Sequence, residues 1–341
     1  MLYFHCSERE SMRNVLITGG AGYIGSHCTL DILKNGDSVC VFDNLSSGHI
    51  EIIDKFRAYE NFSFVQGDLK NYDEINNVFK EKNFGAVVHF AGYIEVGESV
   101  LNPQKYYYNN ILGSLNLFDA MLENNIKNIV FSSTAAVYGN PEYTPIDEKH
   151  PKKPINPYGK TKLFIEEILS DYDTAYGLKS IKLRYFNVVG ANSEGFTGEW
   201  HNPETHLIPN ILKSSLGEQK EFNLFGTDYE TKDGTCIRDY VNVEDLTYAH
   251  VLAMEYLLNN HKSEDINLGT NNGNSVKETF EICEKVTGKK IPLKICPRRA
   301  GDSAILVADN KKAKEILNWS PQKTLEQSIQ TAYNWEKIKI N

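Results

Sequence analysis

The fold of this chain is decided by one stretch, Thr18-Gly19-Gly20-Ala21-Gly22-Tyr23-Ile24-Gly25. It follows a short apolar run, Val15–Ile17, and opens a segment with helical periodicity that extends to Asn35. Glycines at such a turn let the backbone approach a pyrophosphate, and the helix N-terminus offers free N–H groups and a positive dipole end. The order of strand, glycine-rich turn and helix is typical of a dinucleotide-binding unit.

A carboxylate follows at the expected distance from this turn. The run Ser38–Phe42 predicts the second strand, and Asp43 ends it, 18 residues after Gly25. A carboxylate there can accept hydrogen bonds from both hydroxyls of an adenosine ribose and would repel a 2′-phosphate. Because Asn44 and Leu45 follow and no arginine is near, the sequence predicts NAD as the cofactor and not NADP.

Strand-like and helix-like segments alternate outward from this turn through the first half of the chain. Further strands are predicted at 62–65, 86–90, 129–131 and 181–185, and their near-continuous apolar character indicates a parallel sheet covered on both faces. After about residue 187 the alternation loosens, and a final helix is expected near Thr324 to Lys337. We therefore predict an α/β protein: a Rossmann-type doubly wound parallel sheet with a smaller mixed α/β C-terminal lobe.

The expected domain boundaries follow from this pattern. Residues 12–187 should form the NAD-binding domain, with later segments near 237–268 returning to it. Residues 188–341 should form mainly the substrate lobe, and 1–11 an extra N-terminal tail.

Composition excludes several classes of partner. The 341 residues carry a net charge of −9, which gives no general attraction for nucleic acid or an anionic membrane. Six cysteines are scattered without a C-x-x-C pair or a neighbouring histidine cluster, so we expect reduced thiols, a cytoplasmic location and no metal. No apolar stretch approaches the roughly 18 residues that a membrane span needs.

A second motif carries acid–base chemistry. Tyr158 and Lys162 stand at i and i+4, so a helix beginning after Pro157 projects both side chains from one face. A nearby ammonium lowers a phenol pKa from its usual value near 10, which suits a general base. The hydroxyls of Ser132, Ser133 and Thr134 follow the fifth predicted strand, at the sheet edge where open α/β sheets bind ligands.

Together these motifs resemble the extended short-chain dehydrogenase/reductase family, most closely its nucleotide-sugar epimerases. The resemblance runs from about Asn14 to Trp335 and rests on the blocks T-G-G-A-G-Y-I-G-S-H (18–27), H-F-A-G (89–92), V-G-E-S (96–99), S-S-T-A-A-V-Y-G (132–139), Y-G-K-T-K (158–162), R-Y-F-N (184–187), G-T-C-I-R-D-Y-V (234–241) and P-R-R-A-G-D (297–302). It implies inversion at C4 of UDP-glucose and UDP-galactose through a 4-keto sugar, with tightly held NAD and a homodimer formed through helices near Ser99 to Asn124 and Pro157 to Thr174.

The resemblance also assigns roles to individual residues. Tyr158 would be the base, Lys162 would hold the nicotinamide ribose, and Thr134 would hydrogen-bond the reacting sugar oxygen. The expected NAD contacts are Gly19, Gly22, Tyr23, Ile24, Gly25, Asp43, Asn44, Ser47, Gly48, Asp68, Leu69, Phe90, Ala91, Gly92, Asn109, Ser132, Tyr158, Lys162 and Tyr185. The expected UDP-sugar contacts are Thr134, Asn187, His206, Leu207, Asn223, Phe225, Arg238, Tyr240, Val276, Arg299, Asp302 and Leu306, with the two arginines on the diphosphate.

Departures and alternatives refine this interpretation. Well-known members carry a basic residue near Ile94, so that one cofactor contact is absent here. Dehydratases of the family place Asp and Glu directly after the catalytic Thr, whereas this chain has Ala135 and Ala136, which cannot transfer a proton. A UDP-glucuronate epimerase, a reductase and a noncatalytic NAD-sensing protein stay open as alternatives.

Leu306 predicts substrate breadth. In related epimerases a tyrosine at this position fills the space beside the sugar C2 substituent. Leucine is shorter and leaves room for an N-acetyl group, so we expect activity on UDP-N-acetylglucosamine and UDP-N-acetylgalactosamine as well.

Overall fold

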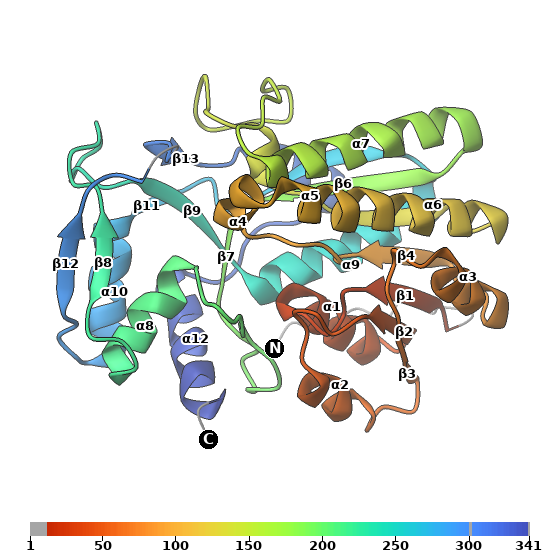
Figure 1. Cartoon of the computed structure of the whole chain (residues 1–341), viewed down its shortest axis with the longest axis horizontal. Helices are drawn as coiled ribbons and strands as arrows, with labels where there is room; N and C mark the ends of the chain where they lie inside the picture. The colour runs from red at the N-terminus through yellow and green to blue at the C-terminus, as the bar shows by residue number, and fades with distance from the viewer. Residues whose placement is uncertain (1–11, 300–301, 340–341) are drawn as a thin grey trace. The chain divides into compact units, whose positions relative to one another are not determined.

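A computed structural model describes residues 12–299 and 302–339 (Figure 1). The expected tail, 1–11, lies outside these described residues. The chain forms two compact units, each built from separate stretches of sequence. The first comprises the described part of Met1–Ser133, with Asn156–Leu183 and Thr247–Asp265; the second comprises Thr134–Ile155, Arg184–Leu246 and the described part of Ile266–Asn341.

The first unit is built on a seven-stranded sheet. Its strands are β1 (Asn14–Thr18), β2 (Ser38–Asp43), β3 (Phe62–Gln66), β4 (Ala86–His89), β5 (Asn128–Ser132), β6 (Lys179–Tyr185) and β10 (Glu264–Leu268), the last two continuing into the second unit along the chain. Its helices are α1 (Tyr23–Lys34), α2 (Ile50–Phe56), α3 (Tyr72–Glu81), α4 (Val96–Leu101), α5 (Pro103–Tyr106), the π-helix η1 (Tyr107–Leu112), α6 (Gly113–Glu123), α7 (Pro157–Tyr176) and α9 (Val243–Asn260), which begins in the second unit.

The strand order of this sheet is β10-β6-β5-β4-β1-β2-β3. Neighbouring strands from β3 to β6 pair in parallel, which confirms the predicted Rossmann-type sheet. From β1 the strands β2 and β3 follow towards one edge of the sheet, whereas β4, β5 and β6 follow towards the other edge, so the strand order reverses between the hydrogen-bonded neighbours β1 and β4. Ligands of open α/β sheets bind beyond the carboxyl ends of the strands at such a switch point. The glycine-rich turn after β1 and the loop after β4 therefore occupy the expected edge.

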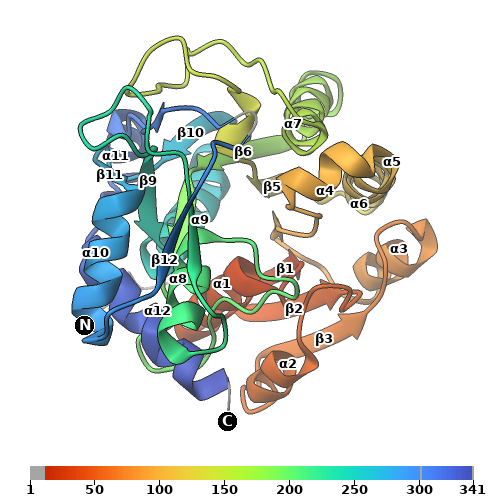
Figure 2. The ribbon, with the colours of Figure 1, turned by 60° about the vertical axis from the view of Figure 1, so that its left-hand side comes forward.

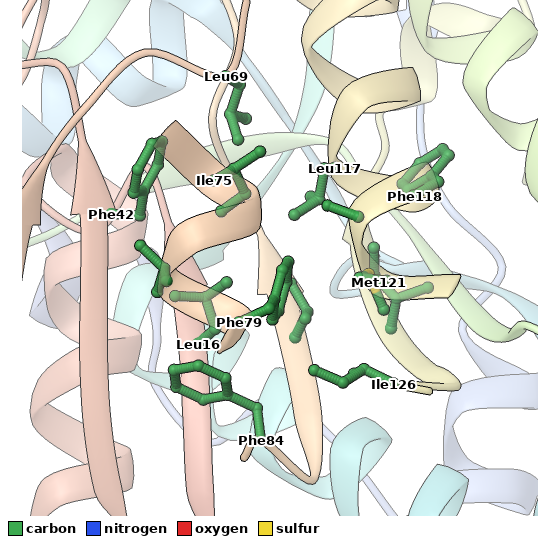
Figure 3. Close-up of a cluster of buried hydrophobic side chains, with 14 of the residues drawn as sticks. Leu16, Phe42, Leu69, Ile75, Phe79, Phe84, Leu117, Phe118, Met121 and Ile126 are labelled. Carbon is green, nitrogen blue, oxygen red and sulfur yellow. The ribbon is translucent and has the colours of Figure 1, made fainter. Parts of the chain in front are cut away.

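One face of the sheet is covered by α3, α6 and α7. Side chains from the strands, such as Leu16 and Phe42, pack with Phe79 of α3 and Phe118 of α6 in a continuous buried cluster (Figure 3). Burying each large apolar side chain of this kind stabilises the fold by about 1.5–3 kcal/mol. This cluster fixes α7, the helix that carries the predicted Tyr-Lys pair, against the sheet.

Helices α1 and α9 cover the other face (Figure 1). Thr247 of α9 donates a hydrogen bond to Asp31 of α1 at 2.5 Å. Arg13, just before β1, pairs with Asp37 at 2.6 Å and lies 3.6 Å from Glu255 of α9. A sheet with helices on both faces explains why its strands read as apolar runs without alternation.

The prediction of helix near Ser99 to Asn124 is wrong in one respect, because this region is divided into α4, α5, η1 and α6. Helix α4 ends at Leu101, and Asn102 adopts φ −136° and ψ 64° before Pro103 opens α5. The proline ring disfavours helical dihedrals in the residue before it, so the break follows from the sequence. The next segment is a π-helix, η1, whose hydrogen bonds join residues i and i+5. The wider turn rotates the side chains that follow about the helix axis.

The second unit contains shorter elements. They are the 3₁₀ turn η2 (Ala135–Val137), β7 (Asn187–Val189), α8 (Leu207–Leu216), β8 (Phe222–Phe225), β9 (Ile237–Asn242), β11 (Gly273–Ser275), α10 (Val276–Thr287), β12 (Leu293–Cys296), β13 (Ile305–Leu306), α11 (Lys311–Leu317) and α12 (Leu325–Lys339). Figure 2 shows α8, α10 and α12 close together, and their apolar faces enclose a second core that includes Ile211, Phe280 and Ile329. Among the described residues, no helix has both the length and the apolar character that crossing a membrane requires.

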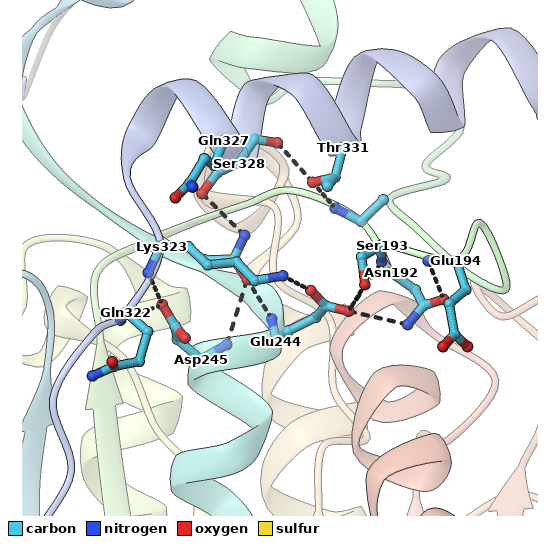
Figure 4. Close-up of polar contacts among 12 residues, drawn as sticks. Asn192, Ser193, Glu194, Glu244, Asp245, Gln322, Lys323, Gln327, Ser328 and Thr331 are labelled. Atoms are coloured by element: carbon cyan, nitrogen blue, oxygen red, sulfur yellow. Dashed lines mark hydrogen bonds and ion pairs between the residues drawn. The ribbon is translucent and has the colours of Figure 1, made fainter. Parts of the chain in front are cut away.

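A polar cluster anchors the start of α9 within the second unit (Figure 4). Asp245 accepts the backbone N–H groups of Gln322 and Lys323, both at 2.9 Å. Glu244 accepts from the Asn192 side chain at 3.1 Å and also pairs with the Lys323 ammonium. The segment before α12 is therefore tied to the first turn of α9.

Candidate active site

The glycine-rich turn after β1 requires glycine for steric reasons. Gly19 has φ +75°, and a Cβ added there would lie 2.6 Å from the backbone nitrogen of Ala91. A Cβ at Gly25 would lie 2.2 Å from the Gly19 carbonyl oxygen, so the first turn of α1 can pack on the loop only without a side chain. Gly22 is the N-cap of α1 and has no side chain to cap the helix. These contacts fit a site where a pyrophosphate meets the helix N-terminus.

Asp43 lies at the end of β2 with both carboxylate oxygens engaged. Its Oδ2 accepts the N–H of Ala21 at 3.0 Å, and its Oδ1 accepts the N–H of Leu45 at 2.8 Å. Burial raises the pKa of Asp43 above its usual value, and these two N–H groups oppose the rise. An ionised carboxylate has about four acceptor positions, so two remain for ribose hydroxyls. The residue both holds the turn and keeps acceptors for a ligand, which fits NAD.

The loop after β2 contacts a second predicted cofactor segment. The Asn44 side chain donates to Asp68 Oδ2 at 3.2 Å, and the Asp68 Oδ1 accepts the N–H of Lys70. These hydrogen bonds lower the pKa of Asp68 although partial burial opposes them. Asn44 and Asp68, which the sequence placed in one site from separate loops, are thus in contact.

Tyr158 and Lys162 lie on the first two turns of α7, as predicted. Asn156 caps the helix by accepting the Gly159 N–H at 2.8 Å, and Pro157 occupies the first helical position. Tyr158 is 8% exposed and Lys162 is 2% exposed. A charged side chain so deeply buried needs specific partners, which makes this pair a candidate functional site.

The surroundings of Lys162 come from the neighbouring strands. Its Nζ donates to the Ser132 carbonyl at 2.8 Å and lies 4.9 Å from the centre of the Phe131 ring. Burial lowers the pKa of Lys162 to about 8, and the charge of Glu166 opposes this fall. Burial, followed by the charge of Lys162, lowers the pKa of His89 to about 3. His89 is therefore neutral at physiological pH, and the lysine stays mostly protonated.

His89 itself is held by hydrogen bonds on both ring nitrogens. Its Nδ1 lies 2.6 Å from Thr18 Oγ1 and its Nε2 lies 2.9 Å from Ser114 Oγ. The Ser114 hydroxyl donates to the Asn110 carbonyl at 2.6 Å. With both ring nitrogens engaged, His89 joins β1, β4 and α6 as a packed polar residue.

Two residues near this site are not predictable from the motifs described above. Glu166 is buried on α7 and accepts a hydrogen bond from Ser133 Oγ at 2.6 Å. Asn110, on η1, accepts the Tyr93 N–H at 2.9 Å and donates to Thr161 Oγ1 at 3.2 Å, so it joins the loop after β4 to α7. The spacing of Glu166, four residues after Lys162, could have revealed it. Asn110 depends on the π-helix, which no sequence pattern indicated.

In the second unit, four predicted UDP-sugar residues lie on three hydrogen-bonded strands. Asn187 of β7 is the register partner of Tyr240 of β9, and Leu306 of β13 is the register partner of Arg238 of β9. The Asn187 side chain donates to the Asp239 carbonyl at 3.2 Å. These four predicted UDP-sugar residues, which come from separate segments of the sequence, are therefore neighbours in this sheet.

The two arginines predicted to bind the diphosphate already make contacts with other residues of the second unit. Arg238 donates to the Ser303 carbonyl at 2.8 Å, and its Nη2 lies 3.6 Å from Asp302. The Arg299 guanidinium lies over the Phe225 ring, 4.0 Å from its centre. Such contacts hold a guanidinium plane in place while leaving N–H groups for phosphate oxygens.

The remaining predicted residues have defined places. Thr134 caps η2 by accepting the Ala136 N–H at 3.1 Å. His206 occupies the N-cap position of α8 without a capping hydrogen bond from its side chain, Leu207 begins that helix, and Asn223 lies on β8. The first unit contains every predicted cofactor residue except Tyr185, which lies in the second unit. The second unit also contains all the predicted UDP-sugar residues, including Thr134. Their roles as ligand contacts stay predictions.

Comparison with known proteins identifies the family. The family model described as GDP-mannose 4,6 dehydratase matches residues 16–332. A curated UDP-glucose 4-epimerase from Rhizobium leguminosarum bv. trifolii is 47% identical over 321 residues, which cover 94% of this chain and 96% of that protein.

Two solved structures are similar along nearly their whole length. One is a UDP-glucose 4-epimerase from Brucella ovis in complex with NAD, with 43% identity and a TM-score of 0.90, covering 94% of this chain and 98% of that one. The other is a UDP-Glc/GlcNAc 4-epimerase from Campylobacter jejuni, with 41% identity and a TM-score of 0.85, covering 96% and 99%. The chain therefore belongs to the UDP-glucose 4-epimerase family, within the larger family that the GDP-mannose 4,6 dehydratase model describes.

Proposed function

We propose that this protein is an NAD-dependent epimerase that interconverts UDP-glucose and UDP-galactose by inversion at C4. The observation that carries the proposal is the buried Tyr158-Lys162 pair on α7, in a unit whose glycine turn and Asp43 suit NAD. Family membership supports the same reaction, since its curated relatives at this identity are UDP-glucose 4-epimerases.

The residues of the first unit would handle the proton of the sugar. Tyr158 accepts the proton of the 4-hydroxyl as C4 becomes a carbonyl carbon and returns it when the hydroxyl re-forms. Lys162, protonated below its pKa of about 8, stabilises negative charge on the Tyr158 oxygen through the field of its ammonium. Bound NAD would supply the hydride acceptor for C4 and the source from which the same hydride returns to the opposite face of the sugar. No net oxidation results.

The residues of the second unit would hold the nonreacting half of the substrate. Arg238 and Arg299 bind the diphosphate oxygens, and Thr134 donates a hydrogen bond to the sugar oxygen at C4. Most of the binding energy then comes from UDP, which keeps the 4-keto sugar bound while its ring turns over.

A product analysis tests the reaction directly. The purified protein is incubated with UDP-galactose, without added NAD, and the products are separated by chromatography. We expect UDP-glucose to accumulate to equilibrium, with NAD released from the denatured protein at about one per chain. Formation of a dehydrated, oxidised or reduced sugar, or no conversion at all, would contradict the proposal.

We infer that the substrate range includes UDP-N-acetylhexosamines. Leu306 lies on β13 beside Arg238 of β9, so its side chain belongs to the same strand group as a predicted diphosphate ligand. A leucine leaves more room than a tyrosine for an N-acetyl group at C2. The similar Campylobacter jejuni protein is a UDP-Glc/GlcNAc 4-epimerase.

A single substitution tests this inference. Leu306→Tyr should abolish conversion of UDP-N-acetylgalactosamine and retain conversion of UDP-galactose. Leu293→Tyr, on the exposed strand β12, is the matched control and should change neither substrate. Equal loss of both substrates in Leu306→Tyr would show that the leucine does not control access at C2.

We also infer a homodimer formed through α4, η1 and α7. Leu101 at the end of α4 is 86% exposed, and Val100, Tyr108 of η1 and Phe164 of α7 are also exposed. Large apolar side chains gathered on adjacent helices mark a surface that a partner covers. Light scattering after gel filtration should give twice the chain mass, and a monomer mass at micromolar concentration would refute the dimer.

A further inference from the structure

Two glutamates and two histidines of the second unit converge in the segment that leads into α8. They are Glu199, His201, Glu204 and His206, called here the Glu199–His206 cluster. Each offers one ligand atom, and all four atoms lie within 4.8 Å of one another. One member, His206, is an expected UDP-sugar contact, and the other three have no role in the proposed reaction.

The distances within the cluster suit a small metal ion. His201 Nδ1 lies 3.3 Å from Glu199 Oε1 and 3.9 Å from Glu204 Oε1, and His206 Nδ1 lies 3.6 Å from Glu204 Oε1. Ligand atoms placed about 2.1 Å from a tetrahedral metal are separated by roughly 3.4 Å. Three of the ligand pairs therefore need shifts of only about half an ångström.

Another of the six ligand pairs is closer, because it is now joined by a hydrogen bond, and the remaining two pairs lie within the same 4.8 Å. His206 Nδ1 and Glu199 Oε1 are 2.5 Å apart. A metal ion would displace the proton that these atoms share, and they would separate by roughly 1 Å to reach tetrahedral spacing.

Glu204 supplies the second, independent indication of a ligand. Its side chain is only 1% exposed, and its Oε1 faces both histidine rings. Oε1 also accepts the His206 backbone N–H at 2.9 Å, whereas the buried Oε2 has no hydrogen-bond partner among the described residues. A buried carboxylate with an unpartnered oxygen is costly, and a cation bound to this carboxylate would neutralise its charge and reduce that cost.

We propose that the Glu199–His206 cluster binds one divalent transition-metal ion, and that Zn²⁺ is the ion its ligands fit. Two imidazole nitrogens and two carboxylate oxygens form a four-ligand set that zinc accepts. Calcium and magnesium prefer oxygen ligands throughout, so the two histidines disfavour them. The proposal departs from the expectation, drawn from the scattered cysteines, that the chain holds no metal.

Such an ion would connect the segment before α8 to α12. His206 is the N-cap residue of α8, and the Glu199 carbonyl accepts the Trp335 indole N–H of α12 at 2.9 Å. Ligands at both ends of residues 199–206 would fix this segment between the two helices. The role is structural, and it does not depend on the proposed epimerase reaction.

Cobalt spectroscopy of the purified NAD-containing protein tests the proposal. After dialysis against a chelator and then metal-free buffer, the protein is titrated with Co²⁺, and the visible absorption of the metal is recorded. We expect intense tetrahedral bands that saturate at one Co²⁺ per chain and disappear when Zn²⁺ is added. Glu204→Gln and His201→Asn should each weaken binding by roughly 100-fold or more, because loss even of an outer-shell partner costs 10–100-fold.

Matched controls separate the site from general metal adsorption. Glu218→Gln and His261→Asn change exposed residues outside the cluster and should bind Co²⁺ like wild type. Circular dichroism establishes that each variant is folded. Absence of saturable Co²⁺ binding in wild type, or tetrahedral bands that persist in a folded Glu204→Gln variant, would overturn the proposal. Epimerase activity is not the readout, so failure of the reaction assigned above would leave this test unaffected.

Discussion

Replacement of Asp43 by asparagine should separate two tasks that this side chain combines. The carboxylate accepts one N–H from Ala21 and another from Leu45, while asparagine of the same shape offers a single acceptor oxygen. One of the two N–H groups would face the amide NH₂, at a cost of about 1–3 kcal/mol. Burial raises the pKa of Asp43, so ionisation of this group is unfavourable in the folded protein, and removing the charge returns part of that cost. We expect a net loss of about 1 kcal/mol in the free energy of unfolding.

The effect on NAD should be larger. The two acceptor positions left on the carboxylate are those we assign to the adenosine ribose, and asparagine retains at most one. Loss of one charge-assisted hydrogen bond costs about 1.5–3 kcal/mol, or roughly 10- to 100-fold in affinity. NAD content after gel filtration and the dissociation constant from calorimetry measure this directly. Asp54→Asn, which removes an exposed ion pair with Arg57, is the control and should leave both unchanged.

The pH dependence gives a second readout of the same residue. Because the pKa of Asp43 lies above its usual value, wild type should begin to lose NAD at a higher pH on acidification than an exposed carboxylate would allow. Asp43→Asn has no proton to gain and should show a weak NAD affinity that acid no longer changes. A variant that is destabilised yet binds NAD as tightly as wild type would refute the reasoning, since Asp43 would then hold the loop alone.

Two further substitutions on α7 test the catalytic pair. Tyr158→Phe should keep NAD bound and reduce turnover by about 10²–10⁴-fold, because the general base is lost. Tyr176→Phe changes an exposed tyrosine on the same helix and should have no effect on turnover. If Tyr158→Phe keeps more than about a tenth of wild-type turnover, the tyrosine is not the base. Glu166→Gln keeps an acceptor for Ser133 but removes the charge that opposes the fall in the pKa of Lys162. The pKa of Lys162 should then drop below about 8, and the alkaline limb of the pH–rate profile should move to lower pH. Glu167→Gln, the exposed neighbour, is the control, and an identical limb in both variants would exclude Glu166 from tuning the lysine.

The sheet and its glycine turn were predictable because local rules decide them. Val15–Ile17 and the apolar runs that follow have no alternation, which occurs when both faces of a strand are buried, and the turn at Gly19 tolerates no Cβ. The confirmed strands differ from the prediction by at most two residues at either end. Pro103 also indicated a break in the helix expected near Ser99 to Asn124. The break was not predicted, because the amphipathic pattern continues on both sides of the proline.

The parts that could not be predicted depend on contacts between distant segments. Asn110 joins Tyr93 and Thr161 because η1 contains a π-turn, and no period in the sequence shows one. The pairing of Leu306 with Arg238 depends on β13, a strand of two residues that propensity alone does not define. The Glu199–His206 cluster was not predicted, although its residues are close together in sequence, because the scattered cysteines indicated no metal site.

The free-energy cost of burying Lys162 indicates that this residue is present for function and not for stability. A fall in pKa from 10.5 to about 8 corresponds to about 3 kcal/mol that favours the neutral amine in the folded protein. For a lysine with a lowered pKa, this cost is fully present below pH 8 and disappears as pH rises through 8 towards 10.5. The Ser132 carbonyl, the Phe131 ring and Glu166 reduce the cost but do not remove it, and an apolar side chain there would avoid it. A lysine kept charged in the core beside Tyr158 therefore lowers stability at neutral pH, which is expected where a buried charge serves the chemistry of a site.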